Sequence, residues 1–202
     1  MEQWFKSIIR QETEKCRVTT LGEEGKEYDY GILPIESRFN PLYLEAIVAG
    51  MSNMMGDELK RANVVVGIEA KSFVFTPLVA HKNGKSWVAV RKRDYKLADQ
   101  IVITHETAYG KKEDMFCIGL KNSDRVVITD DMISKGGTMI HTINTLRKYC
   151  KVVGAATLYD RGIGRKIVKE QTGLSPKSLA TIDVVDGKVK VLSFYPENNL
   201  GD

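Results

Sequence analysis

The amino-acid sequence predicts an α/β protein whose parallel sheet is flanked by helices. Short β-branched runs alternate with helical segments through the middle of the chain. These runs are continuously apolar rather than alternating, as is typical of strands buried on both faces of a sheet. The expected strands are residues 63–68, 86–90, 125–129 and 152–159. Since ligands bind at the carboxyl ends of strands in such sheets, functional side chains are expected there.

Helix signals lie before and between these strands. Apolar side chains near the N-terminus have helical spacing (Trp4, Phe5, Ile8, Ile9). Asn40-Pro41 is typical of a helix start and predicts a helix through residues 42–55. Further helices are expected toward His81, over residues 138–149, and over residues 165–171, with Gly173 closing the last one.

Two antiparallel strand pairs complete the predicted fold. Residues 101–107 and 114–118 are expected to form a flexible arm around Gly110, and residues 180–185 and 188–192 to turn at Asp186-Gly187. The chain, residues 1–202, is expected to be a single domain with its core at about 60–160. A small hood is expected from about residues 1–40 and 160–202.

The composition limits the classes of function. Hydrophobic residues make up 43% of the 202 residues and charged residues 28%, as in ordinary soluble proteins. Thirty Lys and Arg against 26 Asp and Glu leave a net charge of +4, which is too small to indicate nucleic acid but suits a small polyanion. Three separated cysteines favour reduced thiols. Without a leader or a membrane-spanning run, a cytoplasmic protein with no membrane or nucleic-acid partner is expected.

One segment, residues 126–138, carries the strongest functional signal. The predicted strand is followed by two adjacent carboxylates, Asp130 and Asp131, and then by a Ser-Lys-Gly-Gly-Thr turn that opens a helix. The glycines let the backbone approach a ligand, and the amides of the turn and helix start make an anion cradle. The carboxylates can accept hydrogen bonds from neighbouring sugar hydroxyls. The segment therefore predicts a sugar-phosphate site, because a plain capped turn would not explain two repelling carboxylates.

This segment resembles the phosphoribosyl-diphosphate (PRPP) motif of type I phosphoribosyltransferases, and a weaker resemblance extends over about residues 64–164. The resemblance implies the fold of that family, with Asp130 and Asp131 on the ribose hydroxyls. It implies a cradle for the 5′-phosphate made of Ser134, Lys135, Gly136, Gly137 and Thr138. Lys135 stands where the family usually has Thr or another small residue. Mg²⁺ bound through PRPP is also implied, with Asp130 as a candidate protein ligand.

Two further segments agree with this resemblance. Residues 69–73 resemble the Glu-Ala-Arg-Gly-Phe loop that touches diphosphate in adenine phosphoribosyltransferases, so Lys71 and Ser72 are expected to bind diphosphate. Lys71 keeps the charge of the family's Arg but loses its bidentate fork. Arg91 and Lys92 follow Val90 as in that family's Val-Arg-Lys and are expected to face the diphosphate, although such a basic loop taken alone is more often a solvated surface.

The predicted arm departs from the adenine enzymes. Their arm carries Glu-Tyr-Gly, whereas this chain has Ala108-Tyr109-Gly110. The arm is more similar to that of archaeal purine phosphoribosyltransferases, which include members that act on hypoxanthine and guanine.

The base is expected beside residues 158–164, after the last core strand. Asp160 can accept a hydrogen bond from the N6 amino group of adenine, and Tyr159 or Ile163 can pack on the ring. The alternative is that Asp160 pairs with Arg161 or Arg165 on the surface. A 6-oxopurine would instead need a donor opposite O6.

Together, these features predict an enzyme that forms a purine nucleoside 5′-monophosphate and diphosphate from PRPP and a purine base, in purine salvage. Asp131, as a proton acceptor, and Lys71 are the expected catalytic residues. Adenine, giving AMP, is favoured, with a hypoxanthine/guanine enzyme as the alternative. A PRPP-binding regulator without catalysis is a second alternative, but no helix-turn-helix pattern or basic stripe supports it. The resemblance implies a homodimer.

Overall fold

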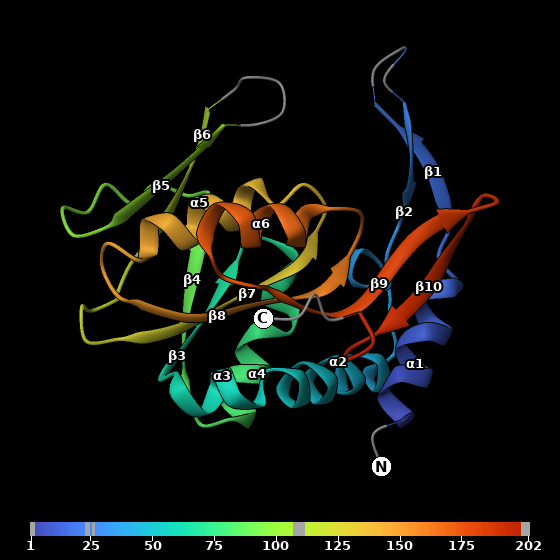
Figure 1. Cartoon of the computed structure of the whole chain (residues 1–202), viewed down its shortest axis with the longest axis horizontal. Helices are drawn as coiled ribbons and strands as arrows, with labels where there is room; N and C mark the ends of the chain where they lie inside the picture. The colour runs from blue at the N-terminus through green and yellow to red at the C-terminus, as the bar shows by residue number, and fades with distance from the viewer. Residues whose placement is uncertain (1–2, 23–24, 26, 107–111, 199–202) are drawn as a thin grey trace.

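The computed structural model describes residues 3–22, 25, 27–106 and 112–198. Within them, an eight-stranded sheet has the strand order β10-β9-β8-β7-β3-β4-β6-β5 (Figure 1). Its inner strands run parallel to one another: β4 (Ser86–Arg91), β3 (Val64–Ile68), β7 (Arg125–Ile133), β8 (Lys151–Asp160) and β9 (Lys177–Val185). The predicted fold class is therefore confirmed.

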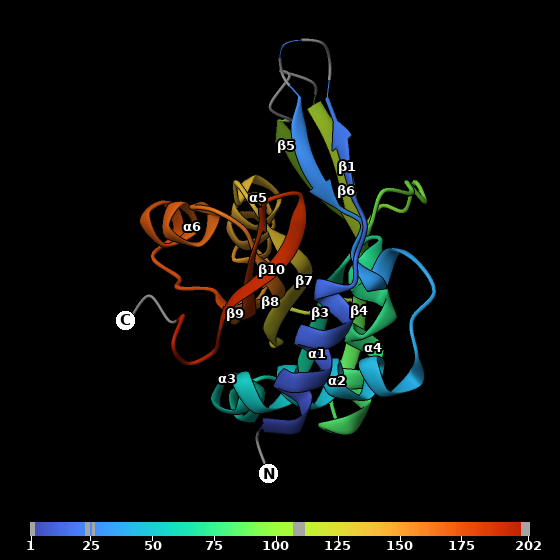
Figure 2. The ribbon, with the colours of Figure 1, turned by 90° about the vertical axis from the view of Figure 1, so that its right-hand side faces the viewer.

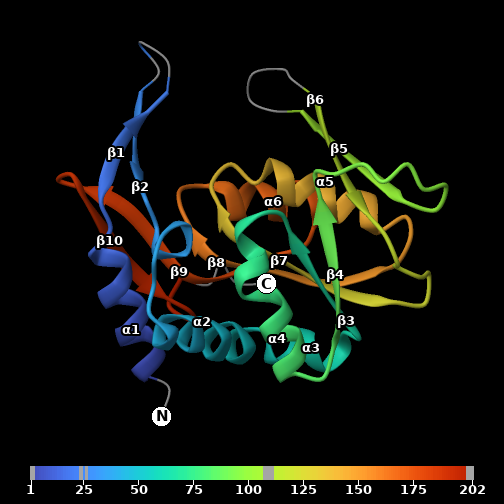
Figure 3. The ribbon, with the colours of Figure 1, turned by 180° about the vertical axis from the view of Figure 1, so that it is seen from behind.

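Helices cover both faces of this sheet. One face carries α5 (Gly137–Leu146) and α6 (Gly164–Thr172), and the other carries α1 (Gln3–Glu14), α2 (Pro41–Met54), α3 (Gly56–Arg61) and α4 (Thr76–Lys82) (Figures 1 and 3). Val65 packs into the core with α1, α2 and α4, whereas Val64 and Val66 pack into the core with α5. Strand β3 is thus buried at every position, which explains its continuous apolar run.

Local signals explain where these elements begin and end. The side chain of Asn40 accepts a hydrogen bond from the amide of Tyr43 at 2.8 Å, just before α2. At the end of α6, Gly173 has a φ of +69°, which glycine adopts without a steric penalty. The antiparallel pair β9 and β10 (Lys188–Phe194) turns at Asp186-Gly187, as predicted. No helix of the described residues is long and apolar enough to cross a membrane.

Two antiparallel hairpins project from the same end of the molecule (Figures 1 and 2). The predicted arm consists of β5 (Ile101–Glu106) and β6 (Lys112–Cys117), and β6 joins the sheet beside the carboxyl end of β4. Residues 108–110 lie outside the described part of the chain. The other hairpin, β1 (Val18–Leu21) with β2 (Tyr28–Gly31), was not predicted. Its sequence signal is a pair of β-branched or aromatic stretches around a glycine-containing turn.

Candidate active site

The two carboxylates lie within a strand, not after it. Strand β7 continues to Ile133, because it pairs with β8 as far as Asp160. The amide of Asp131 donates to a carboxylate oxygen of Asp130 at 2.8 Å. Burial and the neighbouring Asp131 raise the pKa of Asp130. Burial also raises the pKa of Asp131, although Lys71 opposes that effect. The pair is therefore poised to bind hydroxyl donors or a cation.

The turn after β7 has the shape of an anion cradle. Gly136 is the N-cap of α5 with a φ of +80°, and a Cβ there would lie 2.7 Å from Val168 and 2.9 Å from the carbonyl oxygen of Gly164. At Gly137 a Cβ would point into open space. The first amides of a helix have no acceptor within it, so an anion in that space can bind them. Ser134 and Lys135 are exposed beside it, and Thr138 is half-buried at the start of α5.

Lys71 lies at the centre of a compact polar cluster. It belongs to the short helix η2 (Lys71–Val74), just after β3. Its Nζ lies 2.8 Å from a carboxylate oxygen of Glu36, 2.9 Å from the hydroxyl of Tyr30 and 3.8 Å from Asp131. Burial opposes the charge of Lys71, but its bonds to Glu36 and Tyr30 outweigh that effect and raise its pKa. The structure therefore brings together the two residues predicted to be catalytic, Asp131 and Lys71.

The loop after β4 faces the loop after β3. A carboxylate oxygen of Glu69 accepts the backbone amide of Lys92 at 2.7 Å and lies 3.9 Å from Nε of Arg91. Arg91 donates to the hydroxyl of Tyr95 at 2.9 Å. The Lys92 ammonium is 65% exposed and 3.8 Å from Glu113 of the arm. Ser72 was predicted to bind diphosphate, but the whole residue is buried and its hydroxyl donates to the Ile68 carbonyl at 2.5 Å, so neither its side chain nor its backbone is exposed to a ligand.

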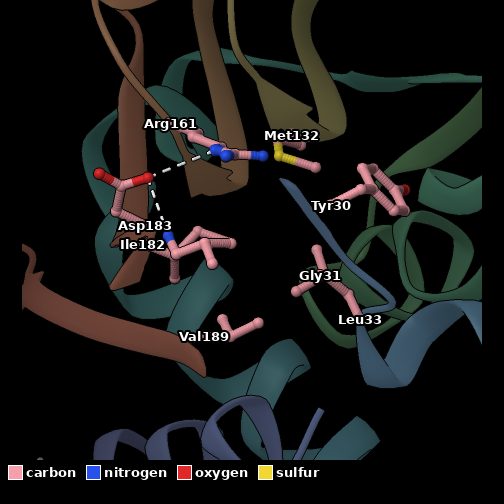
Figure 4. Close-up of a pocket in the computed structure, with 9 residues that line it drawn as sticks. Tyr30, Gly31, Leu33, Met132, Arg161, Ile182, Asp183 and Val189 are labelled. Atoms are coloured by element: carbon pink, nitrogen blue, oxygen red, sulfur yellow. Dashed lines mark hydrogen bonds and ion pairs between the residues drawn. The ribbon is translucent and has the colours of Figure 1, made fainter. Parts of the chain in front are cut away.

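A pocket opens between the N-terminal hairpin and the sheet, beside the polar cluster around Lys71 (Figure 4). Tyr30, Gly31 and Leu33 form one side, with Met132 and Arg161 from the ends of β7 and β8 opposite. The remaining wall comes from β9 and β10 (Ile182, Asp183, Val184, Val189). Nε of Arg161 lies 3.5 Å from a carboxylate oxygen of Asp183. Apolar walls with one cation and one anion are a lining that suits a flat heterocycle with polar edges. The space between them in this structure is about that of one water molecule, so a base has to widen the pocket when it enters.

The structure corrects the residues predicted to bind the base. Tyr159 is fully buried, and its hydroxyl bonds with Thr13 at 2.5 Å and Tyr43 at 2.8 Å, so its ring packs in the core. Asp160 is 4% exposed and forms a 2.8 Å ion pair with Arg165. The pairing alternative is thus correct, except that the pair is buried and not on the surface. Ile163 is 67% exposed at the start of α6, outside the described lining of the pocket.

Three residues of the site were not predicted: Glu36 beside Lys71, and Arg161 and Asp183 in the pocket. Tyr30 was expected as part of the N-terminal hood, but its contact with Lys71 was not. Arg161 directly follows a parallel strand, which is a usable signal. Glu36 is the third residue after Leu33, and Pro34 lies between them, which is a pattern typical of a helix start. The side chain of Glu36 accepts a hydrogen bond from the Leu33 amide at 3.0 Å. Nothing local marks Asp183 or the contact of Tyr30 with Lys71.

A carboxylate pair, an anion cradle and a basic loop thus lie together at the carboxyl ends of parallel strands. The part of the chain that carries them matches a known family. The profile of the phosphoribosyl transferase domain matches residues 44–174. The chain belongs to this phosphoribosyltransferase family. The match ends before β9 and begins after β2, so it excludes most of the pocket wall.

Curated relatives agree on the family, and solved structures agree on the fold. The hypoxanthine/guanine phosphoribosyltransferase of Methanothermobacter thermautotrophicus is 34% identical over 82% of this chain and 86% of its own. That of Methanocaldococcus jannaschii is 33% identical over 92% of this chain and 100% of its own. The adenine phosphoribosyltransferase structure from Rhodothermus marinus has a TM-score of 0.70 at 22% identity, covering 87% of this chain and 99% of that one. The last likeness concerns the fold alone.

Proposed function

We propose that this protein is a phosphoribosyltransferase for 6-oxopurines, which converts hypoxanthine or guanine and PRPP into a nucleoside 5′-monophosphate and diphosphate. The observation that carries the choice of base is Arg161 in the pocket wall. A guanidinium is always a donor, and it can donate to O6 and N7 of a 6-oxopurine. The N6 amino group of adenine is also a donor, so it cannot form a hydrogen bond with the Arg161 guanidinium. The names of the archaeal relatives support the same choice.

In this proposal, PRPP lies along the strand ends. Its 5′-phosphate occupies the cradle from Ser134 to Thr138, and its ribose hydroxyls donate to Asp130 and Asp131. Its diphosphate lies against Lys71, Arg91 and the exposed Lys92. The position of the pocket supports this arrangement, because Met132 follows Asp131 and Tyr30 contacts Lys71.

The donor set suits Mg²⁺ carried by the substrate. Asp130 and Asp131 offer carboxylate oxygens, and the described residues contain no group of three side chains able to hold a metal. The ion would therefore take most of its ligands from PRPP and water, as Mg²⁺ commonly does. When bound, it supplies neutralisation of the negative charge on diphosphate.

The reaction is a substitution at the anomeric carbon. The bond from the base N9 to that carbon forms, the bond to diphosphate breaks, and the N9 proton must leave. Asp131 is the proposed acceptor, because its raised pKa makes it a stronger base than an ordinary aspartate. Lys71 and Arg91 stabilise the charge on the departing diphosphate. The arm β5–β6 and the N-terminal hairpin β1–β2 lie on either side of the proposed site, where they can limit the access of water to it.

Adenine stays a second candidate because of one residue. The Asp183 carboxylate lines the pocket and is an acceptor that can take the amino group of adenine. In its ion pair with Arg161, the Asp183 side chain is 52% exposed and the Arg161 side chain only 26%, so the protein encloses more of the donor than of the acceptor. The 6-oxopurine assignment is therefore preferred. The homodimer and the cytoplasmic location stay predictions.

The test is diphosphate release from PRPP and Mg²⁺ with hypoxanthine, guanine, xanthine, adenine, uracil and orotate supplied separately. Turnover with hypoxanthine or guanine and at most weak turnover with adenine is expected. Turnover with adenine alone would transfer the assignment to the second candidate. Binding of PRPP without turnover of any base would contradict the enzyme and favour a PRPP-binding regulator.

A further inference from the structure

Glu36 makes contacts that the proposed reaction does not by itself require. It ends the short helix η1 (Pro34–Glu36), between the N-terminal hairpin and α2. One carboxylate oxygen accepts the Tyr30 hydroxyl at 2.7 Å and lies 2.8 Å from the Lys71 ammonium. The other accepts the Leu33 amide at 3.0 Å. Both oxygens are therefore engaged, and the side chain is only 17% exposed.

In this structure, the protein's own side chains neutralise the Lys71 ammonium. It has a carboxylate at 2.8 Å, a phenol at 2.9 Å and a second carboxylate, Asp131, at 3.8 Å. An ammonium has three donors, of which Glu36 and Tyr30 take two, while Asp131 at 3.8 Å lies beyond hydrogen-bond distance. A diphosphate can therefore accept the third donor directly, but it must displace Glu36 or Tyr30 to accept more than one. Glu36 would also repel a diphosphate directly, because both are anions.

We propose that Glu36 is a positioning residue that holds Lys71 against Tyr30 while the diphosphate subsite is empty and yields Lys71 when diphosphate enters. This inference rests on the proposed function, since it takes Lys71 as a diphosphate ligand. Glu36 then acts as an internal substitute for the substrate's anion. When diphosphate departs, the carboxylate recaptures the ammonium and favours release of the product.

The same contact connects the two halves of the site. Tyr30 lines the pocket proposed for the base (Figure 4). Its hydroxyl also bonds to both Glu36 and Lys71. Movement of Lys71 toward diphosphate removes one partner of that hydroxyl. Occupation of the diphosphate subsite is therefore transmitted to a wall of the base pocket.

Calorimetric titration with Mg²⁺-diphosphate tests this inference in the whole chain. Glu36→Gln keeps the shape of the side chain but removes the competing charge. It is expected to tighten diphosphate binding by about three- to tenfold, the range expected when a partly exposed ion pair no longer competes. A residue with a merely structural role would weaken binding on substitution. Weaker or unchanged binding in E36Q would overturn the inference.

The chain offers a matched control. Glu58 forms an ion pair with Lys177 at 2.8 Å and is 15% exposed, close to the values for Glu36, but it lies on α3 near the start of β9. Glu58→Gln is expected to leave the Kd for diphosphate within about twofold of the wild type. Urea unfolding of both variants shows whether each is folded before its affinity is interpreted.

A double-mutant cycle identifies the route of the effect. In a Lys71→Met background, E36Q is expected to change diphosphate affinity by less than about twofold, because the cation for which it competes is gone. An equal tightening in both backgrounds would mean that Glu36 acts by general repulsion, which would overturn the positioning role. If the wild type neither binds diphosphate nor releases it from PRPP, the proposed function itself fails and this inference fails with it. Normal turnover with no effect of E36Q would overturn this inference alone.

Discussion

The guanidinium of Arg161 lies 3.5 Å from the carboxylate of Asp183 at the edge of the pocket. This ion pair connects the residue after β8 to strand β9. The ion pair fixes one donor and one acceptor at the edge of an otherwise mostly apolar space. Such a pair discriminates between purines by their edges, because a mismatched donor leaves a polar group without a partner. The choice of base is therefore expected to depend on Asp183 of β9, which lies outside the part of the chain that the family profile matches, and on Arg161, which lies inside it.

Arg161→Gln is expected to lower kcat/KM for hypoxanthine and guanine by roughly 10- to 100-fold, because the charged donor to O6 is lost. Activity with adenine is expected to fall less or to rise. Steady-state kinetics with the three bases measure the effect. The control is Arg61→Gln, since Arg61 contacts the Val153 carbonyl at the opposite end of the sheet. Equal losses for all three bases would show that Arg161 does not select the base.

Gly137→Ala is expected to fold normally and to raise KM for PRPP by about tenfold, because its methyl group would enter the open space proposed for the 5′-phosphate. Gly56→Ala is a suitable control, as Gly56 also has open space at its Cβ position but lies at the start of α3. An unchanged KM for PRPP in G137A would contradict the position of the cradle.

Asp130→Asn is expected to stabilise the ligand-free protein at neutral pH while abolishing PRPP binding. Burial and Asp131 raise the folded-state pKa of Asp130, so the folded protein binds this proton more tightly than the unfolded chain does. The stability that accompanies the proton is complete below the unfolded pKa and is lost as the pH rises through the folded pKa. The gain in free energy of unfolding should therefore disappear below about pH 4. Urea unfolding at several pH values measures it, and a destabilised variant at pH 7 would contradict the account.

Asp131→Asn is expected to lower kcat roughly 100-fold with the fold intact, because the proposed proton acceptor is removed. The acid side of the pH profile of kcat should lose its dependence on this group. Unchanged turnover would remove Asp131 from the proton transfer and leave it as a ligand of the ribose.

Arg165→Met is expected to destabilise the fold by about 3–5 kcal/mol, since it leaves Asp160 buried without its partner. Adding Asp160→Asn should restore much of that stability, and the ratio of activities with different bases should not change. A change in base preference in the double variant would show that Asp160 contributes to the base pocket after all.

The parts of the site predicted from the sequence are those that are local in the chain. Asp130, Asp131 and Gly136–Gly137 belong to one strand-turn-helix unit, so their spacing locates them. Lys71 lies three residues after β3 and was located by the resemblance of residues 69–73 to a known diphosphate loop. The base pocket could not be located in this way, because it is assembled from four separate regions of the chain. Tyr159 and Asp160 looked available as the last residues of a strand. Their partners, Thr13, Tyr43 and Arg165, lie in helices, and only tertiary packing shows that they are occupied.

The central claim is tested most directly by competition between bases. The protein is supplied with limiting PRPP, Mg²⁺ and equal concentrations of hypoxanthine, guanine and adenine, and the product nucleotides are separated and quantified. Inosine and guanosine 5′-monophosphates are the predicted products, with little AMP. AMP as the main product would contradict the role of Arg161, and the absence of any nucleotide would contradict the enzyme.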